Sequence, residues 1–390
     1  MTRQTALYIH IPFCLSKCDY CDFFSIKCPG NIPDEYVDAL CKEFDFRINS
    51  LQNDTPVQIS TIYIGGGTPS LLTGEQLNKL SSHIFKYDVN PDYEFTVEVN
   101  PDDVTQELLN NLKACKVNRI SCGVQSFSQT VLKSVHRRAG LEQILTALDL
   151  ILQFWKGKIS VDLICGLPGE TQDSMLQGLE KLCSYRNFEG KQVNHISFYS
   201  LSLEENTPLY KKIDTGKVDY DSDFADKLWL TGRDFLLSKG YVQYEVSNFC
   251  QSDNECRNNM VYWESKDYIG IGSGATGTIH KADGSAIRTT GITDIQAYIK
   301  NPCSSYIKEN ISTETARFEF FMMGLRTAKG VDRLRFKSIF NTDFPQKTLE
   351  LFEQWQNKGL AAVKKDNSGE FYSLTQQGLL FLNTFLEQII

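Results

Sequence analysis

Six short runs rich in β-branched and aromatic residues recur in the first 205 residues, and each leads into a helix-compatible stretch or a loop. The runs are ALYIHIP, STIYIGGG, YEFTVEV, NRISCGV, ISVDLICG and NHISFYSL. Between them apolar residues recur with the helical period, as at Val104, Leu108, Leu109 and Leu112. This alternation predicts right-handed βαβ units, and hence a parallel sheet covered by helices.

Each predicted strand ends in polar or glycine-rich residues. After the first run comes a loop with three cysteines, and the others stop at GGGTPS, EVNPDD, GVQSF, DLICGLPG and YSLSLEE. The carboxyl edge is where a barrel of parallel strands carries its active site, so we expect function at this edge. Six units rather than eight predict an incomplete (β/α)6 TIM-like barrel that is open on one side. An open sheet with a ligand at its switch point is the alternative.

The chain is predicted to divide into three parts. Residues 1–240 are expected to form the partial barrel, and residues 241–303 to extend the sheet or close part of its mouth. From residue 304, TETARFEFFMMGLR and QKTLELFEQWQNKGL predict amphipathic helices, and AAVKKDNSGEFYSL predicts a hairpin turning at Asn367, Ser368 and Gly369. Residues 304–390 are therefore predicted to be a small winged-helix-like α+β domain that packs on or covers the barrel.

Charge and hydropathy narrow the class of protein. The 390 residues carry 40 basic and 48 acidic side chains, a net charge of −8. This balance argues against a nucleic-acid partner held by general attraction to phosphates. No apolar run reaches the ~18 residues of a membrane span, and the N-terminus lacks the apolar stretch of a secretory signal. We expect a cytoplasmic protein.

Three cysteines follow the first predicted strand directly: Cys14, Cys18 and Cys21, spaced C-x3-C-x2-C. Three loop thiolates at this spacing can face one centre. Zinc would require a fourth ligand, for which His10 and Asp22 are the nearby candidates. A 4Fe–4S cluster held by only three thiolates leaves one iron open to a small chelating ligand, and the amino and carboxylate groups of S-adenosylmethionine (SAM) suit that iron.

The other cysteines are expected to be structural, since a reducing compartment does not favour disulfides. Five of them fall in predicted helices or strands and should pack as small apolar side chains: Cys41, Cys115, Cys122, Cys165 and Cys183. The spacing of Cys250, Cys256 and Cys303 matches no metal-ligand pattern. The three loop thiols are therefore the candidate metal ligands.

The cysteine motif, with Tyr20 just before its last cysteine, resembles that of the radical SAM superfamily. Over nearly the full length the chain is similar to the oxygen-independent coproporphyrinogen III oxidase group, which includes the HemW haem chaperones. The segments that carry this likeness include YIHIPFC, YIGGGTPSLL, EVNP, NRISCGVQSF, DLICGLPGET, YSLSLEENTPLY, YEVSNF and YIGIGSGATG. The resemblance implies a 4Fe–4S cluster on the three cysteines, an electron donor for it, and SAM contacts at Tyr8, Tyr20, Gly66, Gly67, Thr68, Glu98, Gln125, Arg137 and Asp162.

These residue types suit SAM. Glycines let the backbone approach a ligand without a Cβ in the way. Glu98 and Asp162 can accept hydrogen bonds from an ammonium group or from ribose hydroxyls. Arg137 can form a forked contact with a carboxylate, and Gln125 offers both a donor and an acceptor.

Two features favour the haem-chaperone branch over the oxidases. Phe23 stands where the oxidases of this group carry an additional cysteine, and only 13 residues precede Cys14, whereas the oxidases have a longer extension. The resemblance therefore implies a protein that binds haem or a porphyrin and passes haem to an unknown acceptor protein. Radical decarboxylation of coproporphyrinogen III is the alternative, and other radical SAM chemistry on an unknown substrate is a third hypothesis.

The haem-associated HNxxYW signature of the HemW branch is NNMVYW here, with Asn258 at the histidine position and Tyr262 and Trp263 retained. Thr276 also stands where relatives often have histidine. An amide is a poor haem ligand. Haem could instead be held by Cys256 or Tyr262, or by porphyrin contacts with Tyr262 and Trp263, or it could have been abandoned. The loop CQSDNECRNN is expected to be exposed, which would leave the Cys256 thiol accessible.

Overall fold

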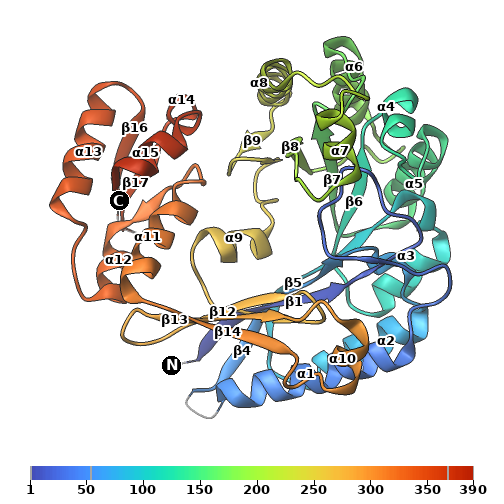
Figure 1. Cartoon of the computed structure of the whole chain (residues 1–390), viewed down its shortest axis with the longest axis horizontal. Coiled ribbons are helices and arrows are strands. Elements are labelled where there is room, and N and C mark those ends of the chain that lie inside the picture. The colour runs from blue at the N-terminus through green and yellow to red at the C-terminus, as the bar shows by residue number, and fades with distance from the viewer. Residues whose placement is uncertain (1, 53–54, 367–368, 390) are drawn as a thin grey trace.

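The computed structural model in Figure 1 describes residues 2–52, 55–366 and 369–389. Its main feature is a twelve-stranded sheet of order β14-β13-β12-β11-β1-β4-β5-β6-β7-β8-β10-β9. The centre of the sheet contains the six predicted strands, all parallel to one another. They are β1 (Arg3–Ile11), β4 (Val57–Gly66), β5 (Val89–Val99), β6 (Arg119–Gln125), β7 (Lys158–Cys165) and β8 (His195–Ser200).

Later segments extend both edges of this sheet. β11 (Tyr268–Ile271) pairs with β1 as a further parallel strand, and β12 (Thr276–His280), β13 (Ala286–Gly291) and β14 (Tyr306–Ile311) continue antiparallel. At the other edge lie β10 (Asn248–Cys250) and β9 (Val242–Gln243). Because β14 and β9 are the two ends of the order, the sheet curves without closing, and the predicted partial barrel is confirmed.

Helices cover the outer face of the curved sheet (Figure 1). They are α1 (Asp34–Gln52), α2 (Gly74–Ile84), α3 (Gln106–Ala114), α4 (Gln129–Ser134), α5 (Leu141–Phe154), α6 (Gln172–Ser184) and α8 (Ser222–Ser238). Most begin at a Ser, Thr or Asp whose side chain accepts from the first turn; Thr73 and Gln76 form a full capping box at α2. The helices thus start where the polar strand-end loops finish.

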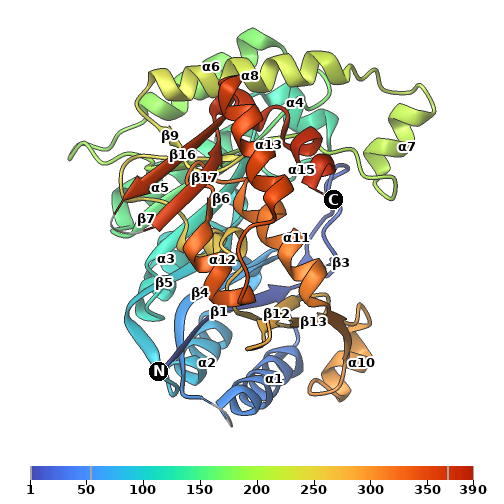
Figure 2. The same ribbon diagram turned by 90° about the vertical axis from the view of Figure 1, so that its left-hand side faces the viewer.

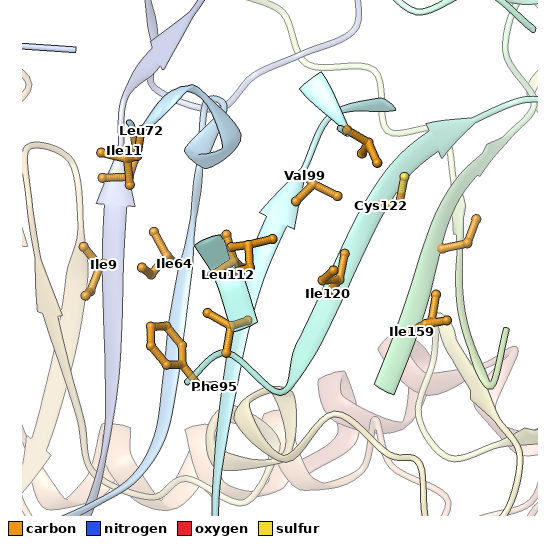
Figure 3. Packing of buried hydrophobic residues seen from close by; sticks show 14 of the residues in the cluster. Ile9, Ile11, Ile64, Leu72, Phe95, Val99, Leu112, Ile120, Cys122 and Ile159 are labelled. Carbon is orange, nitrogen blue, oxygen red and sulfur yellow. The ribbon is translucent and has the colours of Figure 1, made fainter. Parts of the chain in front are cut away.

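The two faces of the parallel strands differ in character. The outward side chains form the apolar core beneath the helices, as Figure 3 shows for Ile9, Ile64, Phe95, Ile120 and Ile159. The inward positions of β5 to β8 are polar: Glu94, Thr96, Glu98, Arg119, Ser121, Ser160, Asp162, His195, Ser197 and Tyr199. Barrels of this kind usually fill their interior with branched apolar residues. This interior is instead a polar chamber.

The C-terminal unit packs helices against a small antiparallel sheet (Figure 2). Its helices are α11 (Thr313–Gly324), α12 (Arg333–Phe340), α13 (Gln346–Asn357), α14 (Gln376–Leu379) and α15 (Leu382–Ile389), and its sheet has the order β15 (Val331–Asp332), β17 (Gly369–Leu374), β16 (Ala361–Asp366). Its core is rich in phenylalanine. The predicted hairpin is confirmed by the β16–β17 pairing, and its turn residues Asn367 and Ser368 lie outside the described residues. The winged-helix-like expectation holds.

Backbone hydrogen bonds join the C-terminal unit to the barrel. The Val246 amide donates to the Arg326 carbonyl at 3.0 Å, and the Ala328 amide donates to the Tyr244 carbonyl at 2.9 Å. β14, at the start of the segment expected to form this unit, instead extends the large sheet. In the part of the chain that the structure describes, no helix has both the length and the apolar character that a membrane crossing needs.

Candidate functional site

A cavity of about 500 Å³ begins at the cysteine loop and continues into the barrel as far as Arg119, His195 and Cys256. Eleven of the twelve predicted site residues line it: Cys14, Cys18, Cys21, Tyr20, Gly66, Gly67, Thr68, Glu98, Gln125, Arg137 and Asp162. They come from loops and strand ends that lie up to 148 positions apart in sequence. The parallel sheet brings them together because it collects every strand's carboxyl end at one edge.

The three thiols are held at the mouth of this cavity. Cys14 lies in β2 (Phe13–Cys14), and the Thr68 hydroxyl donates to its sulfur at 3.5 Å; Arg137 donates to the Cys18 sulfur at 3.6 Å. A Cβ at Gly67 would lie 3.0 Å from the Cys14 sulfur, so glycine keeps the thiol's surroundings clear. Burial raises the pKa of the Cys21 thiol to about 11, so this thiol needs a bound metal's charge to ionise at neutral pH.

The donor set fits a cluster held by three thiolates. Among the described residues, no group of three or more His, Cys, Asp or Glu side chains is placed to hold a single metal ion. A four-iron cluster does not need such a group, because each thiolate binds a different iron atom. His10, a fourth ligand in the zinc alternative, has both ring nitrogens engaged. Its Nδ1 pairs with the Tyr8 hydroxyl at 2.9 Å and its Nε2 with the Phe24 carbonyl at 2.9 Å.

Glu98, near the end of β5, is the acidic group closest to the glycine turn. It accepts from the Tyr63 hydroxyl at 2.8 Å and from the Gly66 amide at 3.1 Å. Burial raises its pKa to about 7, although these two hydrogen bonds oppose the rise. Gly66 has φ +118°, and a Cβ there would lie 2.6 Å from the His10 ring. Packing within the protein is therefore enough to require glycine at this position.

Gln125 and Arg137 meet at the end of β6. The β6–β7 register shifts between Gly123 and Gln125, and Gln125 has the left-handed φ of 69°, which turns its side chain toward the cavity. Arg137 donates through Nη2 to the Asn100 side chain and to the Gly123 carbonyl, both at 2.5 Å. Its Nε is buried and has no partner among the described residues.

Asp162 lies on β7, the second strand along the sheet from the β5 strand that carries Glu98. The Ser121 hydroxyl donates to it at 2.9 Å. Burial raises the pKa of Asp162, and hydrogen bonds from Ser197 and Ser121 oppose that rise. The cavity thus holds two half-buried carboxyl groups, on β5 and β7, with β6 between these two strands.

Tyr8 is the predicted site residue that does not line the cavity. It lies on β1, bonded to His10, and burial raises its pKa well above the usual value. The structure places it beside the site, where it positions His10 beneath the glycine turn.

The floor of the barrel is closed by α9 (Arg257–Trp263), which lies inside the curve of the sheet (Figure 1). Asn258 is buried there. Its Oδ1 accepts from the Thr61 hydroxyl at 2.9 Å, and its Nδ2 donates to the Tyr262 hydroxyl at 3.0 Å. The segment that resembles a haem-binding signature is thus part of the barrel floor.

The expectation that Cys256 is accessible is wrong, because this residue is 3% exposed. Arg119 donates to the carbonyls of Asn254 and Glu255, which draws the end of the loop onto the barrel. Burial raises the pKa of the Cys256 thiol to about 12. Only the middle of the loop, at Ser252, Asp253 and Glu255, is exposed.

Replacing Thr61 with valine is expected to destabilise the protein by about 1–3 kcal/mol, because Asn258 loses its hydrogen-bond donor in a buried site. The measurement is the melting temperature by circular dichroism. Thr96 is a matched control: its hydroxyl is equally buried but has no partner among the described residues. Thr96→Val should leave the melting temperature unchanged, and equal losses in the two variants would contradict this account of the floor.

Comparison with known proteins identifies the family. Residues 8–182 match the radical SAM superfamily. The chain is 33% identical to the haem chaperone HemW of Buchnera aphidicola subsp. Schizaphis graminum, over 98% of this chain and 97% of that protein. It is 32% identical to the haem chaperone HemW of Escherichia coli K12, again over 98% and 97%. The chain belongs to the HemW family.

The fold of this HemW family member also matches a solved structure. Coproporphyrinogen III oxidase HemN of Escherichia coli, a radical SAM enzyme, covers 99% of this chain, and 90% of its own chain is matched, with a TM-score of 0.80. At 21% identity this likeness supports the fold alone. It agrees with the partial barrel and its C-terminal unit.

Proposed function

We propose that this protein is a haem chaperone of the HemW type that acts in the cytoplasm. It would bind a 4Fe–4S cluster and SAM and pass haem to an acceptor protein. The observation that carries the proposal is the similarity to HemW chaperones over 98% of the chain. Phe23 supports the chaperone branch, because it stands at the oxidases' cysteine position and is 69% exposed beside the cysteine loop.

Cys14, Cys18 and Cys21 would hold the cluster. They face one cavity, and His10, one of the two candidates for a fourth ligand, is engaged in hydrogen bonds. Arg137 and Thr68 donate to two of the three sulfurs and would stabilise their negative charge when the thiols ionise. When bound, the cluster supplies one-electron reduction of the SAM sulfonium, with the electron coming from an external donor.

The part of the cavity next to the cysteine loop and the strand ends, here called the upper half, would hold SAM. The lower half is the part that reaches Arg119, His195 and Cys256. Arg137 has an unpartnered Nε there, which suits a carboxylate, and Gln125 offers a donor and an acceptor. Glu98 and Asp162 are placed to accept from an ammonium group and from ribose hydroxyls. Tyr20, Gly66, Gly67 and Thr68 complete this part of the wall, and Tyr8 supports it from behind.

The experiment that tests the class of protein is a pair of assays on one anaerobically reconstituted sample. Titration with ferric haem should give a saturable Soret band, and incubation with coproporphyrinogen III, SAM and a reductant should give no detectable decarboxylation. The physical reason is that Phe23 replaces the cysteine that the oxidases carry. Conversion to protoporphyrinogen would show that the protein is an oxidase instead.

A second prediction concerns the haem ligand. Cys256→Ala should leave the Soret position and the haem affinity unchanged within about twofold, because a buried thiol of raised pKa is a poor iron ligand. Asn258→His should not tighten haem binding, since both polar atoms of Asn258 are used inside the barrel floor. A shifted Soret band in the first variant, or clearly tighter haem binding in the second, would contradict this prediction and indicate that haem binds at α9 or at the loop before it.

A further inference from the structure

We propose that the lower half of the cavity is a second binding site, in which Arg119 and Thr96 bind the carboxylate group of a ligand that is present together with SAM. The proposal rests on the proposed function in one respect, the assignment of the upper half of the cavity to SAM. The site itself is built from residues that have no role in holding the cluster or SAM.

Arg119 is a buried cation, and one nitrogen of its guanidinium group makes no hydrogen bond to the described residues. It is 1% exposed, and it lines the cavity. Its Nη1 donates to Glu94 at 3.4 Å and to the carbonyls of Asn254 and Glu255 at 3.1 and 3.3 Å. Its Nη2 has no partner among the described residues. Leaving a buried guanidinium donor unpaired is costly, so the unused donor indicates a ligand.

Thr96 adds a second unused group at the same level. It is the direct partner of Arg119 in the β5–β6 register, it is 0% exposed, and it also lines the cavity. Its hydroxyl has no partner among the described residues. Two adjacent strands therefore present two neighbouring unpartnered polar groups to one cavity, an arrangement that a packed core would not retain.

The surrounding charges favour an anion. Glu94 accepts from Arg119 Nη1 through Oε2, and from the Asn258 backbone amide at 3.3 Å and the Cys256 thiol at 3.7 Å through Oε1, so neither of its oxygens pairs with Arg119 Nη2. His195 pairs with Ser160 at 2.6 Å and with the Tyr244 hydroxyl at 2.9 Å. Burial and the charge of Arg119 lower the pKa of His195 well below its usual value, so it is neutral at pH 7. Arg119 is then the cation that a carboxylate would meet at this level.

The geometry leaves room for both ligands. Glu98 lies two residues beyond Thr96 on β5, and Asp162 pairs with Gly123, four residues beyond Arg119 on β6. Two residues of strand correspond to about 7 Å, so these proposed SAM contacts lie roughly one and two layers above the Arg119 level. A planar guanidinium with a hydroxyl beside it recognises a carboxylate through directed hydrogen bonds. That carboxylate could belong to a small acid or to a propionate side chain of a porphyrin.

Calorimetric titration of the reconstituted, SAM-saturated protein tests the inference with two matched pairs of probes. The small pair is propionate and propionamide, and the porphyrin pair is coproporphyrin III and its tetramethyl ester. At least one acid should bind about tenfold or more tightly than its neutral counterpart, because only the acid pairs with Arg119. Whichever pair shows the preference identifies the source of the carboxylate.

Two threonine variants separate binding from folding. Thr96→Val should weaken the acid about tenfold through loss of one charged hydrogen bond, and should leave the melting temperature and SAM affinity unchanged. Thr61→Val should do the reverse, lowering the melting temperature and leaving acid affinity unchanged, since Thr61 does not line the cavity. Arg119→Lys, which keeps the charge but not the fork, should weaken the acid as well.

The inference is overturned if neither acid is preferred over its neutral analogue. It is also overturned if an acid is preferred but binds equally well to Thr96→Val and Arg119→Lys, because the acid then binds elsewhere. Failure of the wild-type protein to bind SAM would instead contradict the proposed function, and acid binding measured without SAM would still decide whether the Arg119 site exists.

Discussion

Replacing Cys14, Cys18 or Cys21 with alanine, one at a time, removes most of the iron from anaerobically reconstituted protein, together with its broad visible absorption. We expect the iron content to fall from about four atoms per chain to less than about one. The reason is geometric. The three thiols line the same cavity and are the proposed ligands, so losing one would leave a cluster with two protein ligands.

The chain offers a close control for this result. Cys28 follows the same loop, and its amide donates to the Cys14 carbonyl at 2.8 Å. Its half-buried thiol points toward the carbonyls of Gly30 and Asn31, both at 3.6 Å, and does not line the cavity. Cys28→Ala should keep its iron. If this variant lost as much iron as Cys14→Ala, the cluster would have a fourth thiolate ligand and no open iron. Tight binding of zinc without iron would instead favour a zinc site with four protein ligands.

The parallel strands and the edge that carries the site could be predicted from the sequence, because both depend on local pattern. Runs such as NRISCGV and ISVDLICG have the composition of buried strands, and their polar ends must gather at one edge of a parallel sheet. The cysteine spacing fixed the candidate ligands in the same way. The same local reasoning predicted that Cys122 and Cys165 pack as small apolar side chains, and both are buried on their strands.

The barrel floor could not be predicted, because it depends on contacts between distant segments. Arg119 donates to the Asn254 carbonyl, 135 positions away in sequence, and Thr61 donates to the Asn258 side chain, 197 positions away. The loop before α9 is polar in composition, which made Cys256 look accessible, but these two contacts bury its C-terminal end. Local composition carries no information about which distant side chain will accept such a loop.

The polar interior of the barrel, by contrast, could have been predicted from the sequence. Parallel strands covered by helices on the outside of a packed barrel are usually apolar on both faces. Here β6 alternates Arg119, Ser121 and Gly123 with apolar residues, and β8 alternates His195 and Ser197 in the same way. A period of two in such strands indicates a polar interior, and hence a chamber built to hold a ligand.

The affinity for SAM should rise with pH through neutrality. Burial raises the pKa of Glu98 to about 7 in the ligand-free protein, so below that pH the group is mostly a neutral acid. If the ionised carboxylate accepts from the ammonium group of SAM, binding must remove this proton, and the affinity should climb toward a limit of about tenfold per pH unit below pH 7. Above about pH 8 the contribution of Glu98 should level off.

Folding should respond in the opposite direction. The folded protein holds the Glu98 proton more tightly than the unfolded chain, whose glutamate has the usual pKa of 4.5. The contribution of Glu98 to stability is therefore complete below about pH 4.5 and is lost as the pH rises to about 7. The ligand-free protein becomes less stable over the range in which SAM binding strengthens, so a pH-dependent loss of fold would lower the affinity at high pH and does not mimic the expected rise.

Glu98→Gln and Glu170→Gln decide whether Glu98 is responsible. Glu170 is matched to Glu98: burial raises its pKa to about 7, and it accepts from the Gly166 amide at 2.7 Å, but it does not line the cavity that contains Glu98. Calorimetry between pH 6 and 8 should show a flattened profile for Glu98→Gln, and the ratio to wild type removes the titration of SAM's own amine. Glu170→Gln should keep the wild-type slope. If Glu98→Gln kept that slope, or Glu170→Gln lost it, the ammonium of SAM would have to be bound by another group, and Asp162, a second carboxyl that lines the cavity, could accept it.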